Sequence, residues 1–129
     1  MEWGGFYARI KRGDFQVFSL SWVGIVDPDI YRWILHSKMW PPKGANRGRY
    51  SDADMDMWLE QAAESESMDM RRALYAKVQK KMQKDDVYIP LWYEPVIAVA
   101  SKRVQGFKAS PDGGFLGLLS VNILPDGGN

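Results

Sequence analysis

The stretch Ser51–Ala63, with the sequence SDADMDMWLEQAA, decides how the middle of the chain folds. Ser51 and Asp54 have the spacing of a capping box, in which side chains satisfy the free backbone N–H groups at a helix start. Apolar residues then recur at intervals of three and four, which places them on one helix face. They are Met55, Trp58, Leu59, Ala62 and Ala63. We therefore predict an amphipathic helix here with one buried face.

A second helix is predicted to begin near Asp69. Its apolar residues recur every four positions as a single stripe: Met70, Leu74, Val78 and Met82. Basic residues surround this stripe and are concentrated in the second half of the segment. That distribution suits the negative end of a helix dipole and supports the assignment.

Two elements are predicted at the start of the chain. Apolar residues at helical spacing from Trp3 to Ile10, followed by Gly13, indicate a short amphipathic helix that ends at the glycine. The aromatic and branched run Phe15–Trp22 has the length of a strand. Its continuous apolar character predicts a strand that is covered on both faces.

A third helix and a loop are predicted next. Asp27 and Pro28 supply an N-cap and a first-turn proline for a helix that runs to about His36, with Ile30, Trp33 and Ile34 as its apolar stripe. Residues 37–50 contain prolines, glycines and basic residues without apolar periodicity. This composition predicts a long surface loop.

The C-terminal part is predicted to be extended. Residues 87–100 form an apolar run that is broken by Pro90 and Pro95, so we expect two short strands that meet at Pro95. The cluster Pro-Asp-Gly-Gly at 111–114 predicts a turn, with a final strand before the chain reaches Leu124. The alternation of helices and strands indicates an α/β domain.

The composition excludes several classes of function. Seventeen basic and sixteen acidic residues give a formal net charge of +1, so no global field favours nucleic acid or anionic lipid. The chain has no cysteine and one histidine, which removes most nucleophile–base pairs and multi-histidine metal sites. No stretch approaches the roughly 20 apolar residues of a membrane span. We therefore predict a protein that is not an enzyme, with no metal site, cofactor, nucleic-acid partner or transmembrane segment.

Three polar residues leave a catalytic alternative open. Asp27 and Asp29 flank a proline, and a small hydrolase would combine these carboxylates with His36. Structural roles are favoured instead, Asp27 as a helix cap and His36 as a partly exposed residue at a helix end. The hydrolase requires all three side chains to converge, whereas the predicted helix carries His36 far from Asp27.

Aromatic residues stand in the presumed loops and at strand ends, at Trp22, Trp40 and Trp92-Tyr93. Ligands of α/β proteins bind at such places, where rings cover a ligand with little loss of entropy. Glu94 or Asp27 would pair with an ammonium group of the ligand. The alternative reading, in which Trp22 and Trp92 are core residues, is favoured by composition alone.

Short motifs follow one another in a specific order along nearly the whole chain. They are Gly13-Asp14-Phe15, Trp22-Val23-Gly24, Asp27-Pro28-Asp29, Trp40-Pro41-Pro42, Asn46, Tyr50-Ser51, Asp56, Arg72-Ala73-Leu74-Tyr75, Asp85, Ile89-Pro90-Leu91-Trp92-Tyr93, Val104-Gln105-Gly106-Phe107 and Pro111-Asp112-Gly113-Gly114. Their order and spacing resemble the C-terminal region of the extracellular solute-binding proteins of ABC transporters, in the peptide, nickel and glutathione class (family 5). The loop at 40–42 and the turn at Pro111 look most like the glutathione-binding branch.

The resemblance implies a type II periplasmic-binding-protein fold, in which two α/β lobes close on a ligand and deliver it to a membrane permease. Residues 1–95 would form an incomplete C-terminal lobe (lobe II), and 96–129 would cross the hinge and pack on lobe I. Members of this class are longer and carry an N-terminal signal or lipid anchor. The start of this sequence lacks the basic patch and apolar run of a signal peptide, so we expect a truncated member of a periplasmic family.

The resemblance also implies the ligand-binding residues. Trp22 matches a family tryptophan near the ligand, and Tyr93 and Glu94 match the hinge segment that faces the cleft. Oligopeptide binders have an aspartate for the peptide's ammonium group where this sequence has Ile25, and Asp27 would compensate. The expected ligand residues are Trp22, Asp27, Tyr93 and Glu94, and the expected ligand is a short peptide or a glutathione-like compound.

We therefore predict a fragment of a peptide-binding protein of an ABC importer, with cargo binding as its role. The unpaired edges after Val96 favour strand exchange between copies, which predicts a domain-swapped homodimer. The alternative is a stand-alone interaction module, or a non-functional truncated product, that dimerises through its exposed lobe face.

Overall fold

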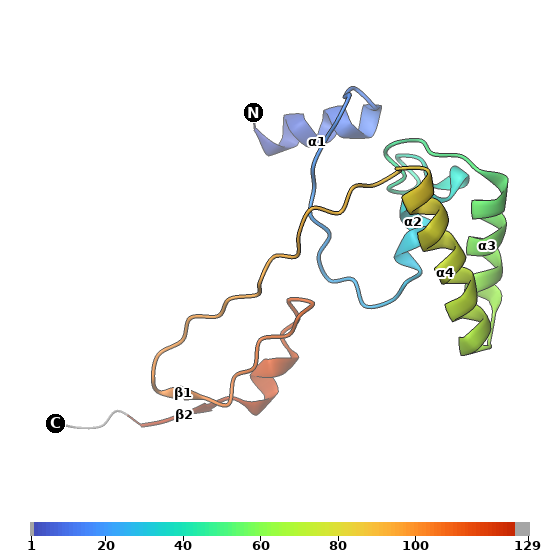
Figure 1. Ribbon diagram of the computed structural model, residues 1–129. Helices are drawn as coiled ribbons and strands as arrows, with labels where there is room; N and C mark the ends of the chain where they lie inside the picture. Colours follow the sequence, from blue (N-terminus) through green and yellow to red (C-terminus); the bar gives the residue numbers. More distant parts are fainter. Residues whose placement is uncertain (1, 126–129) are drawn as a thin grey trace. The chain divides into compact units, whose positions relative to one another are not determined.

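The computed structural model describes residues 2–125 and divides the chain into two compact units. The first unit comprises Met1–Leu20 and Asp27–Pro90, and the second comprises Ser21–Val26 and Leu91–Asn129. The elements, in chain order, are α1 (Trp3–Arg12), α2 (Ile30–Leu35), the 3-10 helix η1 (Ser37–Met39), α3 (Ala53–Glu64), α4 (Met68–Lys84), β1 (Val104–Gln105), the 3-10 helix η2 (Leu116–Ser120) and β2 (Asn122–Ile123) (Figure 1).

The core of the first unit lies between α3 and α4, which run side by side (Figure 1). Met55, Leu59 and Ala62 of α3 are fully buried, so the amphipathic helix predicted there is confirmed, although Ala63, expected on the same face, is exposed. The cap differs by one residue, because the side chain of Asp52, not of Ser51, accepts a hydrogen bond from the Met55 N–H at 2.9 Å. Both the cap and the N–H group that it satisfies thus lie one residue further along the chain than predicted.

Helix α4 begins one residue before the predicted position, with Ser67 as its N-cap. Its buried residues are Leu74, Tyr75 and Val78, whereas Met70 is exposed. Residues spaced by four advance about 40° around a helix at each step, because one turn holds 3.6 residues. The predicted stripe therefore leaves the buried face at its ends, and Tyr75 joins that face instead.

Helix α1 is confirmed, and it ends at Gly13 with a left-handed φ of 78°. Its buried residue is Ile10. Two arginines of the 40–50 loop hold the helix. Arg47 Nη2 donates to the Tyr7 hydroxyl at 3.2 Å, and Arg49 Nη2 donates to the carbonyl of Arg12 at 3.1 Å. The second bond satisfies one of the free carbonyls at the helix C-terminus.

The 37–50 segment contains the short 3-10 helix η1 followed by the loop that its composition predicts, and this loop is folded around a buried residue, Asn46. The side chain of Asn46 is 1% exposed. Its Nδ2 lies 3.1 Å from the carbonyl oxygens of Leu35 and His36 and 2.8 Å from that of Tyr50. A polar side chain can be buried at low cost when all its hydrogen bonds are made, and here they hold an irregular backbone in place.

Neither of the two long strand predictions is confirmed. Phe15–Trp22 and residues 87–100 form no strand, and Val17 and Ile97 are exposed. A strand of continuous apolar character needs a neighbouring strand and a cover on both faces, and residues 2–125 supply neither for these segments. Within the described residues the fold is mainly helical with little sheet, so an α/β class is supported only in part.

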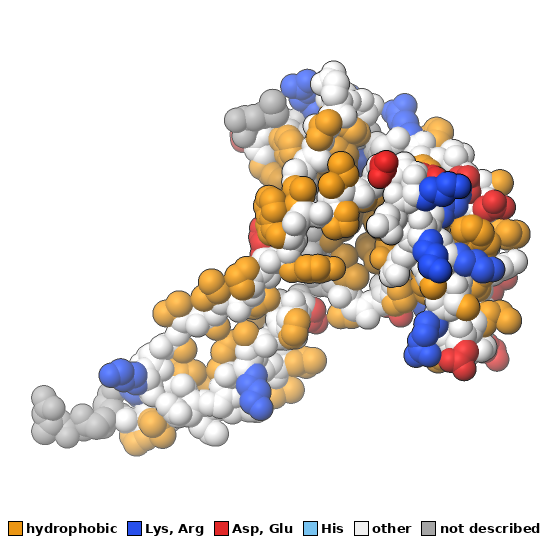
Figure 2. Space-filling view, viewed as in Figure 1, with side chains coloured by type: hydrophobic (Ala, Val, Ile, Leu, Met, Phe, Trp, Pro, Cys, Tyr) orange, Lys and Arg blue, Asp and Glu red, His pale blue; other side chains and the backbone are white. Residues whose placement is uncertain are grey.

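The second unit contains an antiparallel pair of strands, with Val104 opposite Ile123 and Gln105 opposite Asn122. The predicted final strand thus corresponds to β2. The turn predicted at 111–114 is also confirmed, with a bond of 3.0 Å from the N–H of Gly113 to the carbonyl of Ser110 and a left-handed φ of 76° at Gly113. None of the described residues of this unit is buried. Figure 2 shows hydrophobic side chains at the surface where Figure 1 draws this unit.

Candidate ligand-binding site

Asp27 lies in the first unit, in the turn that precedes α2. Its Oδ1 accepts hydrogen bonds from the backbone N–H of Asp29 at 2.8 Å and from Arg71 Nη2 at 3.1 Å. The side chain is 55% exposed. Asp27 therefore organises the turn before the helix and is not the N-cap that the sequence predicts. Helix α2 itself begins only at Ile30, with Asp29 at its N-cap position.

Arg71 and Tyr75 of α4 complete a polar cluster around this turn. The Tyr75 hydroxyl donates to Asp29 Oδ1 at 3.3 Å, and the Arg71 guanidinium lies 5.7 Å from the centre of the Tyr75 ring. Burial raises the pKa of the Tyr75 phenol. Tyr75 and the Asp27 carboxylate both raise the pKa of Arg71. The charge of Asp27 is thus already paired within the unit.

The other three predicted ligand residues lie in the second unit. Trp22 is half-buried, Glu94 is exposed and Tyr93 is 100% exposed. Tyr93 and Glu94 belong to a segment without helix or strand. A shared role of Trp22, Asp27, Tyr93 and Glu94 in one cleft remains a prediction.

His36 is 1% exposed, so the expectation of a partly exposed histidine is wrong. Its Nδ1 accepts a bond from the Lys38 N–H at 3.0 Å, which makes it the N-cap of η1. Its Nε2 lies 3.1 Å from Glu60 Oε1 and donates to it, because Nδ1 is already the acceptor. Both ring nitrogens are engaged, and the ring is closed to solvent.

This environment also explains why the hydrolase alternative is not realised. His36 is held by Glu60 of α3, whereas Asp27 and Asp29 are held by Arg71 and Tyr75 of α4. A general base must reach the proton that it removes from a substrate. The buried ring of His36 offers no such access.

A third polar cluster joins the start of α3 to the end of α4. Lys81 Nζ lies 2.9 Å from Asp52 Oδ2 and 3.2 Å from Asp85 Oδ2, and the Tyr50 hydroxyl donates to Asp85 Oδ2 at 2.5 Å. Burial and the bond to Asp85 raise the pKa of Tyr50. The bond from Tyr50 and the contact with Lys81 lower the pKa of Asp85. These groups satisfy one another, so the cluster is structural.

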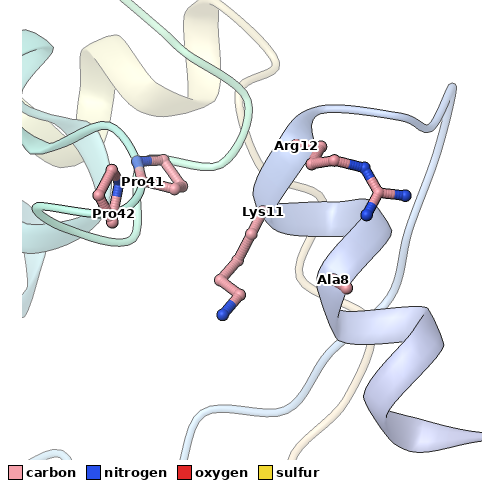
Figure 3. A pocket seen from close by; sticks show the side chains of 5 residues that line it. All are labelled: Ala8, Lys11, Arg12, Pro41 and Pro42. Atoms are coloured by element: carbon pink, nitrogen blue, oxygen red, sulfur yellow. The ribbon is translucent and has the colours of Figure 1, made fainter.

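A hollow of about 300 Å³ lies between the end of α1 and the two prolines of the 40–50 loop (Figure 3). Its lining consists of Ala8, Lys11, Arg12, Pro41 and Pro42. The charged side chains of this lining are cations. It therefore offers no acceptor for the ammonium group of a peptide, and we assign no ligand to it.

Two other features are absent from residues 2–125. This range holds no group of three or more His, Cys, Asp or Glu side chains that could bind a metal ion. Across the same range, every helix is too short or too polar to span a membrane.

Comparison with known proteins identifies relatives that bind peptides. The chain is 28% identical over 114 residues to the probable di/tripeptide-binding protein 5 of Pseudomonas aeruginosa (strain UCBPP-PA14), a match that covers 88% of this chain and 22% of that protein. It is 30% identical over 112 residues to di/tripeptide-binding protein 4 of the same strain, a match that covers 86% of this chain and 21% of that protein.

A further relative binds glutathione. The chain is 33% identical over 79 residues to the glutathione-binding protein GsiB of Salmonella typhimurium (strain LT2), a match that covers 61% of this chain and 15% of that protein. No protein-family model matches the chain.

These comparisons confirm the resemblance to peptide- and glutathione-binding proteins. The relatives are named as binding proteins, not as enzymes, which agrees with the prediction that this chain is not an enzyme. The chain spans about a fifth of the length of the di/tripeptide-binding relatives that it matches.

Proposed function

We propose that this chain is part of a solute-binding protein of an ABC importer and takes part in binding short peptides or glutathione-like compounds. The observation that carries the proposal is the similarity to di/tripeptide-binding proteins over most of the chain. The buried His36 and the paired Asp27 and Asp29 agree with this proposal. These three side chains do not form a catalytic group, so a binding role explains the chain better than a hydrolase does.

We propose Trp22, Tyr93, Glu94 and Asp27 as the ligand-binding residues. The exposed ring of Tyr93 and the half-buried ring of Trp22 would cover the ligand, and Glu94 would pair with its ammonium group. Asp27 uses its Oδ1 for two donors, so Oδ2 would be the oxygen that accepts from a ligand. Glu94 has no partner of this kind among residues 2–125, so it is the stronger of the two acceptors.

We propose further that residues 1–95 correspond to part of lobe II, and 96–129 to the segment that crosses the hinge and packs on lobe I. The absence of buried residues in the described part of the second unit supports this, because such a segment requires a cover from elsewhere. The protein would act in the periplasm and deliver its cargo to a permease. A lobe that contacts half of a ligand gains little against the entropy of association, so the 129-residue chain alone would bind peptides weakly.

The test is a chimera in which this chain replaces the matching segment of di/tripeptide-binding protein 5. Titration calorimetry with trialanine and with glutathione should show binding by the chimera and much weaker binding by the chain alone. Glu94→Gln in the chimera should weaken binding by about tenfold, because a charged hydrogen bond is lost. A folded chimera that binds neither compound would contradict the proposed function, and an unchanged affinity in Glu94→Gln would contradict the site.

We also propose that the 129-residue chain forms a homodimer, because its exposed apolar segments have no cover within residues 2–125. Size-exclusion chromatography with light scattering should give twice the chain mass of 14.8 kDa. A single monomer peak at high micromolar concentration would contradict the dimer.

A further inference from the structure

The segment 95–100, with the sequence PVIAVA, is exposed along its whole length. Val96 is 47%, Ile97 79% and Val99 96% exposed. Within residues 2–125, no hydrogen bond joins the backbone of this segment to another residue. Figure 1 draws it as a trace without helix or strand. The segment therefore presents both apolar side chains and free backbone donors and acceptors.

The composition of this segment favours pairing with another strand. It contains three β-branched residues and no charge. Such a run has high β-propensity, and an uncharged exposed strand pairs with other chains unless something blocks it. The flanking charges are Glu94 on one side and Lys102 on the other.

We propose that, in the 129-residue chain alone, residues 96–100 pair with the same residues of a second copy, as antiparallel strands related by a two-fold axis at Ala98. This rests on the homodimer proposed above and names its interface. In this register Val96 lies opposite Ala100 of the partner subunit, and Ile97 lies opposite Val99 of the partner subunit. A two-fold axis brings one surface against its own copy and closes the assembly as a dimer.

The flanking charges select this register. With the axis at Ala98, Glu94 lies opposite Lys102 of the partner subunit, and symmetry makes this pair twice. Opposite charges across an antiparallel pair stabilise it, and like charges weaken it. Lys102 begins the turn that the bond from the Val104 N–H to the Ser101 carbonyl closes at 2.9 Å. Pairing thus ends at this turn, and the long lysine side chain reaches back to the glutamate.

Pro95 supports the same register. In an antiparallel pair, alternate residues direct their N–H groups toward the partner strand. If Ala98 exchanges hydrogen bonds with Ala98 of the partner subunit, the even-numbered residues face the partner and Pro95 faces outward. The missing N–H of Pro95 then costs no bond at the interface. It also weakens the outer edge of the paired strands, which opposes the addition of a third chain.

The chain has no cysteine, so a single introduced thiol reports one contact. In Ala98→Cys, paired strands place the two Cα atoms about 5.5 Å apart, within the range of a disulfide. Air oxidation should give a covalent dimer at least about tenfold faster than in Ala63→Cys, which places a thiol at an exposed alanine of α3. Equal rates for the two variants would overturn the proposed axis.

Charge exchange tests the register. Glu94→Lys and Lys102→Glu should each weaken dimerisation about fivefold to tenfold in sedimentation equilibrium, because like charges then face each other twice. The double variant should restore the affinity. No restoration would overturn the register, while a dimer that is indifferent to all three changes would overturn the interface and leave the homodimer standing. Peptide binding by the chimera is measured separately, so a failure there would count against the proposed function alone.

Discussion

Asn46 bonds the backbone of Tyr50 at both of its polar groups. Its Oδ1 accepts from the Tyr50 N–H at 2.9 Å, and its Nδ2 donates to the Tyr50 carbonyl at 2.8 Å. The same Nδ2 lies within reach of the carbonyls that end α2. One amide side chain thus joins the end of α2 to the segment that leads into α3.

Replacement of the Asn46 amide by a carboxylate should destabilise the first unit. In Asn46→Asp an oxygen would face three carbonyl oxygens, so donors are lost and a charge is buried without a partner. We expect a loss of about 3 kcal/mol in the free energy of unfolding, measured by urea titration with circular dichroism. Asn122→Asp changes an exposed residue of β2 in the same way and should have little effect. Equal losses would contradict the role of Asn46.

The contact between α3 and α4 should carry much of the stability. Leu59 is fully buried, whereas Met57 on the same helix is 44% exposed. Leu59→Ala should cost about 2–4 kcal/mol, because it removes apolar contacts and leaves a cavity. Met57→Ala should cost much less. Urea titration of both variants measures the difference, and similar costs would show that α3 packs through another face.

The Lys81 cluster should make stability depend on pH on the acid side. Burial acts to raise the pKa of Asp52, but the Met55 N–H and Lys81 outweigh it and lower that pKa. The pKa of Asp85 is lowered by Tyr50 and Lys81. Groups with lowered pKa contribute stability above their unfolded-state pKa and lose it as the pH falls through the folded-state pKa. The urea concentration at the unfolding midpoint should therefore decrease once the pH is lowered below about 4.

Lys81→Met provides the check on that pH dependence. It removes the cation shared by Asp52 and Asp85, so the variant should be less stable at neutral pH and should lose less on acidification. Lys80→Met changes the exposed neighbouring lysine and should retain the normal acid profile. Parallel acid profiles in the two variants would exclude Lys81 as the cause.

The ion pair between Asp27 and Arg71 should appear as an energetic coupling. In a double-mutant cycle, Asp27→Ala and Arg71→Ala should cost less together than the sum of the single changes, because each removes the same contact at 3.1 Å. The matched control is Asp69 with Arg72, also at 3.1 Å but far more exposed. Thermal unfolding followed by circular dichroism measures both cycles. Coupling of equal size in the two pairs would contradict a special role for Arg71.

The sequence allowed the helices to be predicted because their signals are local. The spacing of apolar residues gives α1, α3 and α4, and Gly13 ends α1 where only a left-handed residue fits. The strands expected at 15–22 and 87–100 depend on partners that are remote in sequence or supplied by another chain. Apolar composition cannot report whether those partners are present.

The features of the candidate site also divide into those with a local sequence signal and those that depend on residues remote in sequence. Asp27 was predicted as the N-cap, but it stabilises the turn before the helix, and Asp29 holds the N-cap position. Its pairing with Arg71, 44 residues away, has no local signal apart from the spacing of Arg71 and Tyr75 on one face of a helix. The burial of Asn46 and His36 was missed because apolar periodicity detects hydrophobic cores, whereas these residues are buried through hydrogen bonds.

The lack of buried residues in the described part of the second unit has a calorimetric consequence. The heat capacity change of unfolding comes mainly from apolar surface that becomes hydrated, about 12–15 cal/mol/K per residue in ordinary globular proteins. Residues 91–125 hide little such surface in a single chain. The monomer should therefore show a smaller heat capacity change than its length implies, and a flatter dependence of stability on temperature. Any additional heat capacity change that grows with protein concentration would measure the apolar surface that association removes from water.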